Sequence, residues 1–162
     1  MSISFAKWKR LYCLQRDGDS FINSFLRKVK GVNRTLLVIQ TTNGEVMGGY
    51  ANSPWGSQNE SGGAAFYGSC QASLFKINNL TKKVQVFRWT GSNRYIQVCD
   101  TQAKLLAFGG GGKDGSFGLC IEDDFSVGTT GTCETFNPNE PLCEEGSFEI
   151  LNVECWGFLP GF

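Results

Sequence analysis

Histidine is absent from this chain of 162 residues, and that absence excludes more chemistry than any other feature of the composition. Without an imidazole there is no Ser–His or Cys–His nucleophile pair, the commonest general base is missing, and most zinc and iron sites lose their usual nitrogen ligand. An enzyme made from this chain would have to use carboxylates, thiols, lysine or tyrosine. The composition therefore argues against catalysis.

Closely spaced cysteines are also lacking. No C-x-x-C pair occurs, the number of cysteines is odd, and neighbouring cysteines are ten or more residues apart, at positions 13, 70, 99, 120, 133, 143 and 155. This spacing fits neither a disulfide framework nor a zinc ribbon. Reduced thiols in the cytosol are the simplest interpretation. No apolar run is long enough to cross a membrane, and the N-terminal residues lack the apolar stretch of a signal peptide.

Basic residues are missing from the last third of the chain. All fifteen Lys and Arg lie in residues 1–113, which hold five acids, whereas residues 114–162 hold ten acids and no base. The net charges of about +10 and −10 cancel, and a pI near 6.3 does not show the basic excess expected of a nucleic-acid-binding protein. Two interpretations stay open. The two parts neutralise each other within one domain, or they form a bipolar surface that orients the domain on a charged partner.

What the chain does contain predicts a mainly β fold. It has 21 glycines and 13 phenylalanines, and short segments of alternating apolar residues are separated by turn signals. We expect one domain over residues 1–162, a two-sheet antiparallel β-sandwich with a few short helices. Ser20 as N-cap, an apolar stripe and Gly31 as a stop predict a helix over residues 20–30. The predicted strands are TLLVIQ, EVMGGY, AAFYGS, SLFKI, VQVFRW, YIQVCD, LLAF, SFGLCI and FEILNVECWGF.

The run Gly109–Gly112 followed by Lys113 resembles a phosphate-binding loop at first sight. A P-loop requires Gly at position 107 and Ser or Thr at position 114, and the chain has Ala107 and Asp114. Gly110, Gly112 and Gly115 match G-x-G-x-x-G, but the residues that follow alternate with the period of a strand, and the motif needs a helix. We therefore expect no nucleotide at 109–115, and a glycine-rich turn or a close backbone crossing between strands.

Six blocks of the chain, in order, are similar to the TLDc domain of the eukaryotic oxidation-resistance protein family. They are TLLVIQTTNGEVMGGYANSPW, FYGSCQASLFKI, TGSNRYIQVCD, LLAFGGGG, FGLCIEDDFSVGTTGTCETFN and FEILNVECWGF, and the resemblance covers about residues 8–158. It implies a β-sandwich with short helices, a link to protection from oxidative stress, and binding and regulation of the vacuolar proton pump (V-ATPase). It implies no cofactor and no settled reaction.

The chain departs from the family pattern at two places. Cys70-Gln71 stands where the family usually has Gly-Glu, and Cys120 stands where it usually has an aromatic residue. Any chemical role for the family glutamate is therefore in doubt in this chain.

Three candidate sites remain weak on sequence alone. Cys133 and Glu134 are the best catalytic candidates, although nearby acids raise a thiol pKa and suppress the reactive thiolate. Glu122, Asp123 and Asp124 could hold calcium, but they lack the alternating ligand spacing of an EF-hand loop. Glu144 and Glu145 lie in a turn-like segment and are candidate interaction residues.

The hypothesis that the sequence favours is a non-catalytic, cytoplasmic TLDc interaction module, expected to be a monomer. It would bind V-ATPase subunits and no nucleic acid, insert into no membrane, and reach organelle membranes only through a partner. A thiol-dependent antioxidant enzyme is the alternative. A small-ligand or sugar-binding sandwich, with Trp55, Trp89 and Trp156 as stacking residues, is a third hypothesis, although core packing explains these rings better.

Overall fold

The structure is a computed structural model that describes residues 6–18, 21–56, 66–101, 103–111, 116–122, 125–137, 140–143 and 145–160. Strands dominate it, with one short helical region near the N-terminus. The strands are β1 (Ala6–Cys13), β2 (Thr35–Thr41), β3 (Val46–Ala51), β4 (Ser73–Ile77), β5 (Val84–Trp89), β6 (Gln97–Asp100), β7 (Leu105–Phe108), β8 (Leu119–Glu122), β9 (Val127–Thr130), β10 (Phe136–Asn137) and β11 (Ser147–Pro160). The helical elements are α1 (Leu14–Asp17), the π-helical turn η2 (Phe21–Leu26) and α2 (Arg27–Val29).

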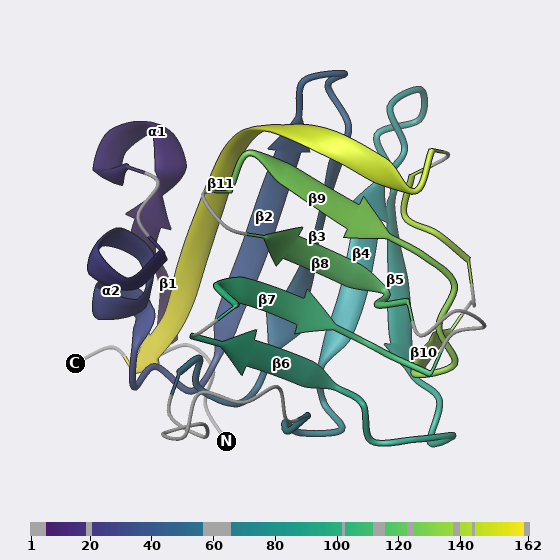
Figure 1. The fold of residues 1–162 in the computed structure, drawn as a ribbon, viewed down its shortest axis with the longest axis horizontal. Helices are drawn as coiled ribbons and strands as arrows, with labels where there is room; N and C mark the ends of the chain where they lie inside the picture. The colour runs from purple at the N-terminus through teal and green to yellow at the C-terminus, as the bar shows by residue number, and fades with distance from the viewer. Residues whose placement is uncertain are drawn as a thin grey trace.

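Two antiparallel layers share one long strand. The first layer has the order β10-β5-β4-β3-β2-β11, with β1 on the other side of β11, and the second continues from β11 through β9, β8 and β7 to β6. Figure 1 shows β6–β9 in front of β2–β5, with β11 bending from one layer to the other. Ser147–Glu149 pairs with β9, and Ile150–Gly157 pairs with β2. The predicted antiparallel sandwich with few short helices is confirmed.

The alternation of side chains along β2 shows why this sequence forms a two-layer fold. Leu37 and Ile39 are buried between the layers, whereas Leu36 and Val38 point to the other face and are half-buried. Successive side chains of a strand point to opposite faces, so a period-two apolar pattern fills the core from one side. A fully buried Leu or Ile contributes about 1.5–3 kcal/mol through the area that it removes from water.

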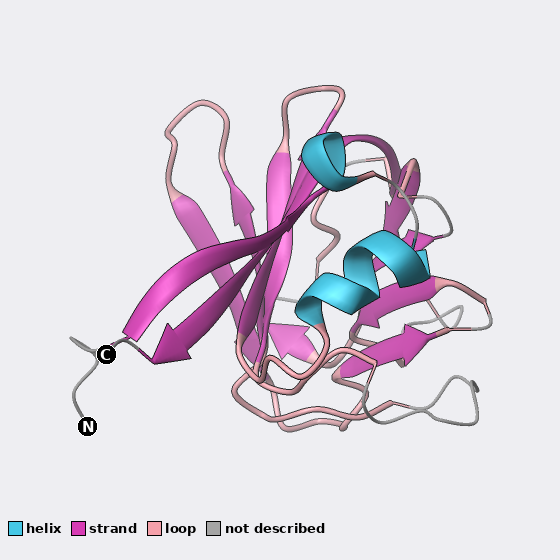
Figure 2. Ribbon diagram, turned by 90° about the vertical axis from the view of Figure 1, so that its left-hand side faces the viewer, coloured by secondary structure: helices cyan, strands magenta, loops and turns pink. Residues whose placement is uncertain are grey.

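The helical region covers the side of the sandwich that faces the viewer in Figure 2. Phe25 of η2 meets Tyr12 of β1 and Phe125 of the β8–β9 connection, with ring centroids 5.1 and 5.3 Å apart in edge-to-face geometry. Val29 of α2 is also fully buried. Edge-to-face pairs add stabilisation beyond the buried area itself. The contacts among Tyr12, Phe25 and Phe125 therefore pack the helical region against the sandwich. No helix in the described ranges is both long and apolar enough to span a bilayer.

Several elements differ from the sequence prediction. The helix over 20–30 is present as η2 and α2 over 21–29, whereas Ser20, its predicted cap, lies outside the described residues. The AAFYGS strand is wrong in its described part, where only Tyr67 forms a bridge, to Gln97. Strands β1, β9 and β10 and helix α1 were not predicted. Lysines and arginines interrupt the apolar residues of β1. Strand β9 has four residues, one Gly and two Thr among them, and β10 has only two residues, so the apolar pattern of both is weak.

Candidate functional site

The glycines after β7 are packed against backbone and side chains. Gly109 and Gly111 have φ of +78° and +74°, a conformation that favours glycine, and a Cβ on Gly109 would lie 2.8 Å from the Cys133 sulfur. The Gly110 N–H donates to the Thr135 hydroxyl at 3.0 Å, and this hydroxyl donates to the Asn93 side chain at 2.8 Å. The prediction that these glycines form a turn or a close backbone crossing is therefore confirmed for 109–111, where positive φ angles and close packing occur together. Positions 112–115, which include Lys113, lie outside the described residues.

The two halves of the Cys133–Glu134 candidate point in different directions. Cys133 is 4% exposed and belongs to the hydrophobic core, where its sulfur lies against Gly109 and Gly118. Glu134 is exposed, and its backbone carbonyl accepts a hydrogen bond from the Thr90 hydroxyl at 2.6 Å. The arrangement is that of a structural cysteine beside a surface carboxylate. It does not present a thiol to substrate.

Most other thiols are buried in the same way. Cys13, Cys99, Cys120, Cys143 and Cys155 are buried, and Cys70 is exposed. Burial raises the pKa of the Cys99, Cys120 and Cys155 thiols to about 12. The thiolate is the nucleophilic form, so thiols whose pKa lies this far above neutral pH are inert. Cys70 is the one exposed cysteine.

The calcium candidate is only partly described. Glu122 is exposed at the end of β8, while Asp123 and Asp124 lie outside the described residues. Within the ranges that the structure describes, no three His, Cys, Asp or Glu side chains converge to hold a metal ion.

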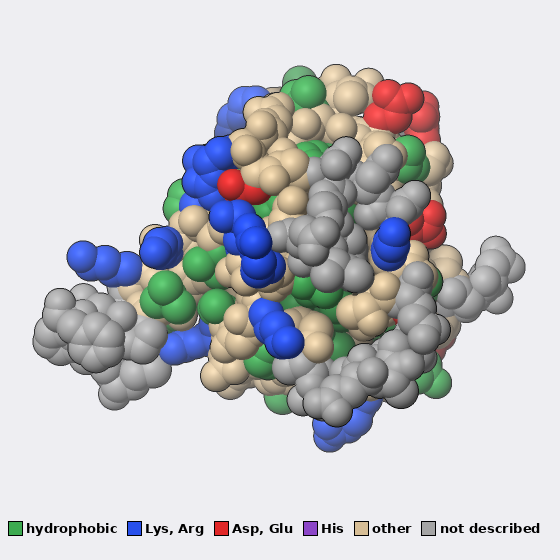
Figure 3. Space-filling model, turned by 60° about the vertical axis from the view of Figure 1, so that its left-hand side comes forward, with side chains coloured by type: hydrophobic (Ala, Val, Ile, Leu, Met, Phe, Trp, Pro, Cys, Tyr) green, Lys and Arg blue, Asp and Glu red, His purple; other side chains and the backbone are tan. Residues whose placement is uncertain are grey.

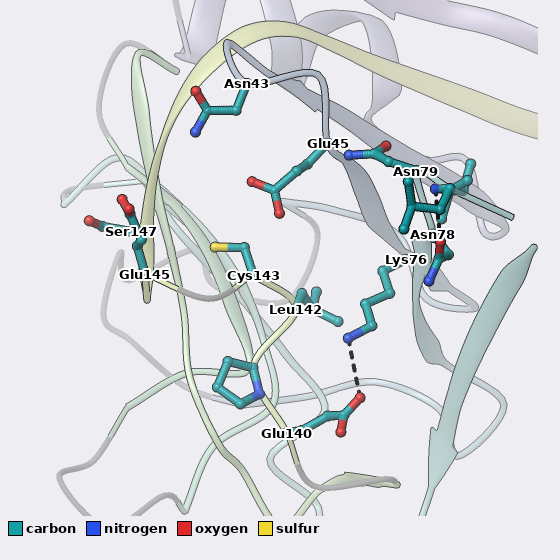
Figure 4. Close-up of a pocket in the computed structure, with 13 residues that line it drawn as sticks. Asn43, Glu45, Lys76, Asn78, Asn79, Glu140, Leu142, Cys143, Glu145 and Ser147 are labelled. Carbon is teal, nitrogen blue, oxygen red and sulfur yellow. Dashed lines mark hydrogen bonds and ion pairs between the residues drawn. The ribbon is translucent and has the colours of Figure 1, made fainter. Parts of the chain in front are cut away.

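A surface pocket of about 700 Å³ lies between two hairpins and the segment that leads into β11. The β2–β3 hairpin, β4 with the turn after it, and the segment around Leu142 each contribute to its wall (Figure 4). Its lining residues are Asn43, Glu45, Lys76, Ile77, Asn78, Asn79, Leu80, Glu140, Pro141, Leu142, Cys143, Glu145 and Ser147. The segment is anchored by Thr130, whose hydroxyl accepts the Leu142 N–H at 2.9 Å and whose N–H donates to the Gly146 carbonyl at 2.9 Å.

The pocket has an acidic excess. Its Lys76 ammonium lies 3.2 Å from Glu140 Oε1, so these two charges compensate each other. Glu45 and Glu145 have no ion pair among the described residues. Burial, and then the charge of Glu45, raise the pKa of the Cys143 thiol, while hydrogen bonds from the backbone of Glu145 and Gly146 oppose this shift.

Of the two predicted interaction residues, Glu145 lines this pocket, and Glu144 lies outside the described residues. The sequence did not reveal Glu45 or Lys76 as its neighbours. Both are far from Glu145 in the chain and carry no local motif, so only the tertiary fold brings them together.

The three tryptophans proposed as stacking residues have partners of their own. Trp55 is fully buried, and its indole N–H donates to the Thr35 hydroxyl at 3.1 Å. The Trp89 and Trp156 indoles donate to the Asn93 carbonyl and the Glu154 carboxylate. Core and surface packing accounts for these rings.

The charge split along the chain is partly neutralised within the fold. Arg10 lies 2.9 Å from Glu154, and Lys76 pairs with Glu140, so both contacts join the basic part to the acidic part. Other charges, including Glu45 and Glu145, remain without such a pair in the described ranges.

Comparison with known proteins agrees with the fold and the six sequence blocks. The profile of the TLDc domain family (TLD) matches residues 2–159. The chain belongs to the TLDc domain family. In this TLDc domain, Gly109 and Cys133, which belong to two of the six similar blocks, lie side by side in the core. The acidic pocket lies beside the β2–β3 and β4–β5 hairpins.

Relatives that share this TLDc domain are longer proteins. "Oxidation resistance protein 1" of Yarrowia lipolytica is 31% identical over 157 residues, which cover 94% of this chain and 64% of that protein. The human protein of the same name is 31% identical over 93% of this chain and 16% of its own length. The Drosophila melanogaster "GTPase-activating protein skywalker" is 31% identical over 92% of this chain and 26% of its own length. The chain thus spans less than two thirds of each of these relatives.

Proposed function

We propose that this TLDc domain is a non-catalytic interaction module of the cytoplasm that supports oxidation resistance by binding and regulating the V-ATPase. The observation that carries the proposal is the TLDc match over residues 2–159, together with relatives named oxidation resistance proteins. The V-ATPase is the partner that the family resemblance implies.

The state of the thiols supports a non-catalytic role. Cys133, the best catalytic candidate, is packed against glycine backbone in the core, and burial holds the pKa of Cys99, Cys120 and Cys155 near 12. A thiol that consumes peroxide needs access and thiolate character. Protection from oxidation would then act through a partner rather than through a cysteine of this domain.

The acidic pocket supports a basic complement on the partner. Glu45 and Glu145 line a concave surface of about 700 Å³, and their carboxylates would suit Lys or Arg side chains of a docking loop. Exposed ion pairs contribute only up to about 1 kcal/mol each, so charge should act mainly on the association rate and its salt dependence.

The test is association with purified V-ATPase subcomplexes measured over a range of ionic strength. Glu145→Lys should slow association by about two- to fivefold at low salt and leave folding intact, because Glu145 is exposed. Glu122→Lys makes the same charge change outside the pocket and should have little effect. The pure domain, with a thiol reductant, should consume no peroxide.

Each part of the proposal has its own contrary outcome. Subcomplexes that fail to retain the domain at low salt would exclude the V-ATPase as partner. Binding that is independent of salt would exclude electrostatic steering. Peroxide turnover that Cys70→Ser or Cys133→Ser abolishes would favour the antioxidant enzyme.

A further inference from the structure

An aromatic cluster lies on a projecting arm, which we define as Ala6–Arg10 of β1 paired with Trp156–Pro160 of β11. Figure 2 shows the paired ends of these strands extending away from the body of the domain. The Trp8 ring centroid lies 4.9 Å from that of Phe158 and 6.5 Å from that of Tyr50 on β3. The guanidinium carbon of Arg34 lies 4.6 Å from the Phe158 ring centroid.

This cluster is open to solvent. Trp8 is 44% exposed, and Arg34, Tyr50 and Phe158 are each partly exposed. Trp, Tyr and Arg are the residue types that dominate binding energy at protein interfaces, because they combine a large apolar area with a polar group. The half-buried Leu36, paired with Tyr50, extends the cluster as an apolar strip across the same face.

The arm also offers backbone groups for pairing. In the described part of the chain β1 pairs with β11 alone, so its other edge has no strand partner. An edge strand presents unpaired N–H and C=O groups to which an extended segment can add as a further strand. Side chains of such a segment would alternate between the face of Trp8 and the face of Lys7 and Lys9.

The charge of the arm selects what can pair there. Arg10 is compensated by Glu154, but none of the ion pairs in the described ranges includes Lys7, Lys9 or Arg34. Figure 3 shows blue basic side chains beside green apolar ones on this projecting part. Like charges on facing strands are destabilising, so two copies of β1 would repel each other, whereas a strand with acids opposite Lys7 and Lys9 would be favoured.

We propose that the arm binds an extended segment of a partner protein by strand addition to β1, and that this segment alternates acidic with apolar or aromatic residues. The acids pair with Lys7 and Lys9 on one face, and the apolar residues pack on Trp8 on the other. Neither a phosphate backbone nor a lipid headgroup uses the free edge of a strand or the apolar strip through Leu36. The proposal concerns a surface separate from the acidic pocket and does not depend on the V-ATPase.

The experiment titrates the isotopically labelled domain with short synthetic peptides and follows its amide resonances by NMR. The probe peptide alternates Glu with Val and Phe. We expect it to shift the amides of β1, and the same peptide N-methylated along its pairing edge to lose binding because its backbone can no longer donate. A peptide with Lys in place of Glu, and one with the same composition in two blocks, should not bind.

Two variants locate the site. Trp8→Ala should weaken binding of the Glu peptide by about tenfold. Reversal of Lys7 and Lys9 to Glu should abolish that binding and create binding of the Lys peptide. Reversal of Lys82 and Lys83 to Glu is the matched control, since it makes the same charge change on the β4–β5 hairpin, and it should leave binding unchanged.

Three results would overturn the proposal. The N-methylated peptide could bind as tightly as the probe, which would exclude strand addition. The Lys82 and Lys83 reversal could weaken binding as much as the Lys7 and Lys9 reversal, which would place the site elsewhere. The domain could ignore the probe but bind a single-stranded oligonucleotide or phosphatidylserine vesicles through Lys7 and Lys9, which would assign the arm to a different class of partner.

Discussion

Gly109 shows how single residues serve the architecture of this domain. Its φ of +78° is costly for a residue with a side chain, and a Cβ at this position would meet the Cys133 sulfur at 2.8 Å and the Phe136 ring at 3.3 Å. Its N–H donates to the Ile96 carbonyl at 3.0 Å, which holds the turn against the neighbouring strand. Glycine is needed at this position because core side chains approach the backbone too closely for any larger residue.

Gly109→Ala is predicted to lower the free energy of unfolding by about 2–4 kcal/mol, from positive-φ strain plus overpacking. Gly31→Ala is the matched control, because Gly31 has a φ of +83° but a Cβ there would meet nothing within 4 Å. It should cost only about 1–2 kcal/mol. Urea denaturation of both variants measures the difference. Equal losses would show that the contact with Cys133 contributes nothing.

At the scale of elements, Asp17 connects α1 to β1 and α2 through polar contacts. Its carboxylate accepts two hydrogen bonds from the Arg16 guanidinium at 2.8 Å and one from the Cys13 N–H at 2.9 Å, and Lys28 of α2 lies 3.8 Å away. The Arg16 hydrogen bonds, followed by the Cys13 N–H and the nearby charges, hold the pKa of Asp17 well below its usual range. The short helices depend on such polar contacts because they have too few residues to be stable alone.

Asp17→Asn is predicted to lower the free energy of unfolding by about 1 kcal/mol at pH 7. Since the pKa of Asp17 is lower in the folded state, its stabilisation is complete above the unfolded value of about 3.9 and is lost as pH falls toward the folded pKa. The difference between wild type and variant should therefore shrink below about pH 4. Glu140→Gln, in an exposed pair, should change stability by less than about 0.5 kcal/mol. A difference that grows on acidification would contradict the assignment.

At the scale of the whole molecule, β11 makes the two layers one cooperative unit. It spans Ser147–Pro160 and pairs with β1, β2 and β9. The register shift between Ile150 and Asn152 lies where the strand leaves β9 and enters the first layer, as expected of a bulge that bends a strand. Because both layers use its backbone, neither keeps its full pairing if β11 is released.

Val153→Ala, at a fully buried position of β11, is predicted to lower the free energy of unfolding by about 2–3 kcal/mol. Hydrogen exchange should accelerate in β3 and β8 by the same factor, although these strands belong to different layers. Val86→Ala is the control, since Val86 is 43% exposed, and it should cost well under 1 kcal/mol. Loss of protection confined to β3 would show that the layers unfold independently.

The local patterns of the sequence determined most strands and the role of the glycines. The predicted strands SLFKI, VQVFRW and LLAF have the same bounds in the structure. Their bounds could be predicted because the apolar residues of each strand and the turn residues beside it lie within a few positions of one another. The spacing around Lys113 excluded a P-loop without any structure. The six blocks pointed to the TLDc family for the same reason, since each is a local string of residues.

The tertiary structure alone decided which residues share a surface. Strand pairing brings Glu45 near Glu145, and it places Arg34 over Phe158 beside Trp8. It also separates the adjacent Cys133 and Glu134, because successive positions can face core and solvent in turn. A sequence specifies each residue's neighbours along the chain, whereas the pocket and the arm arise from contacts between segments that are distant along the chain, such as Lys76 with Glu140 and Trp8 with Phe158.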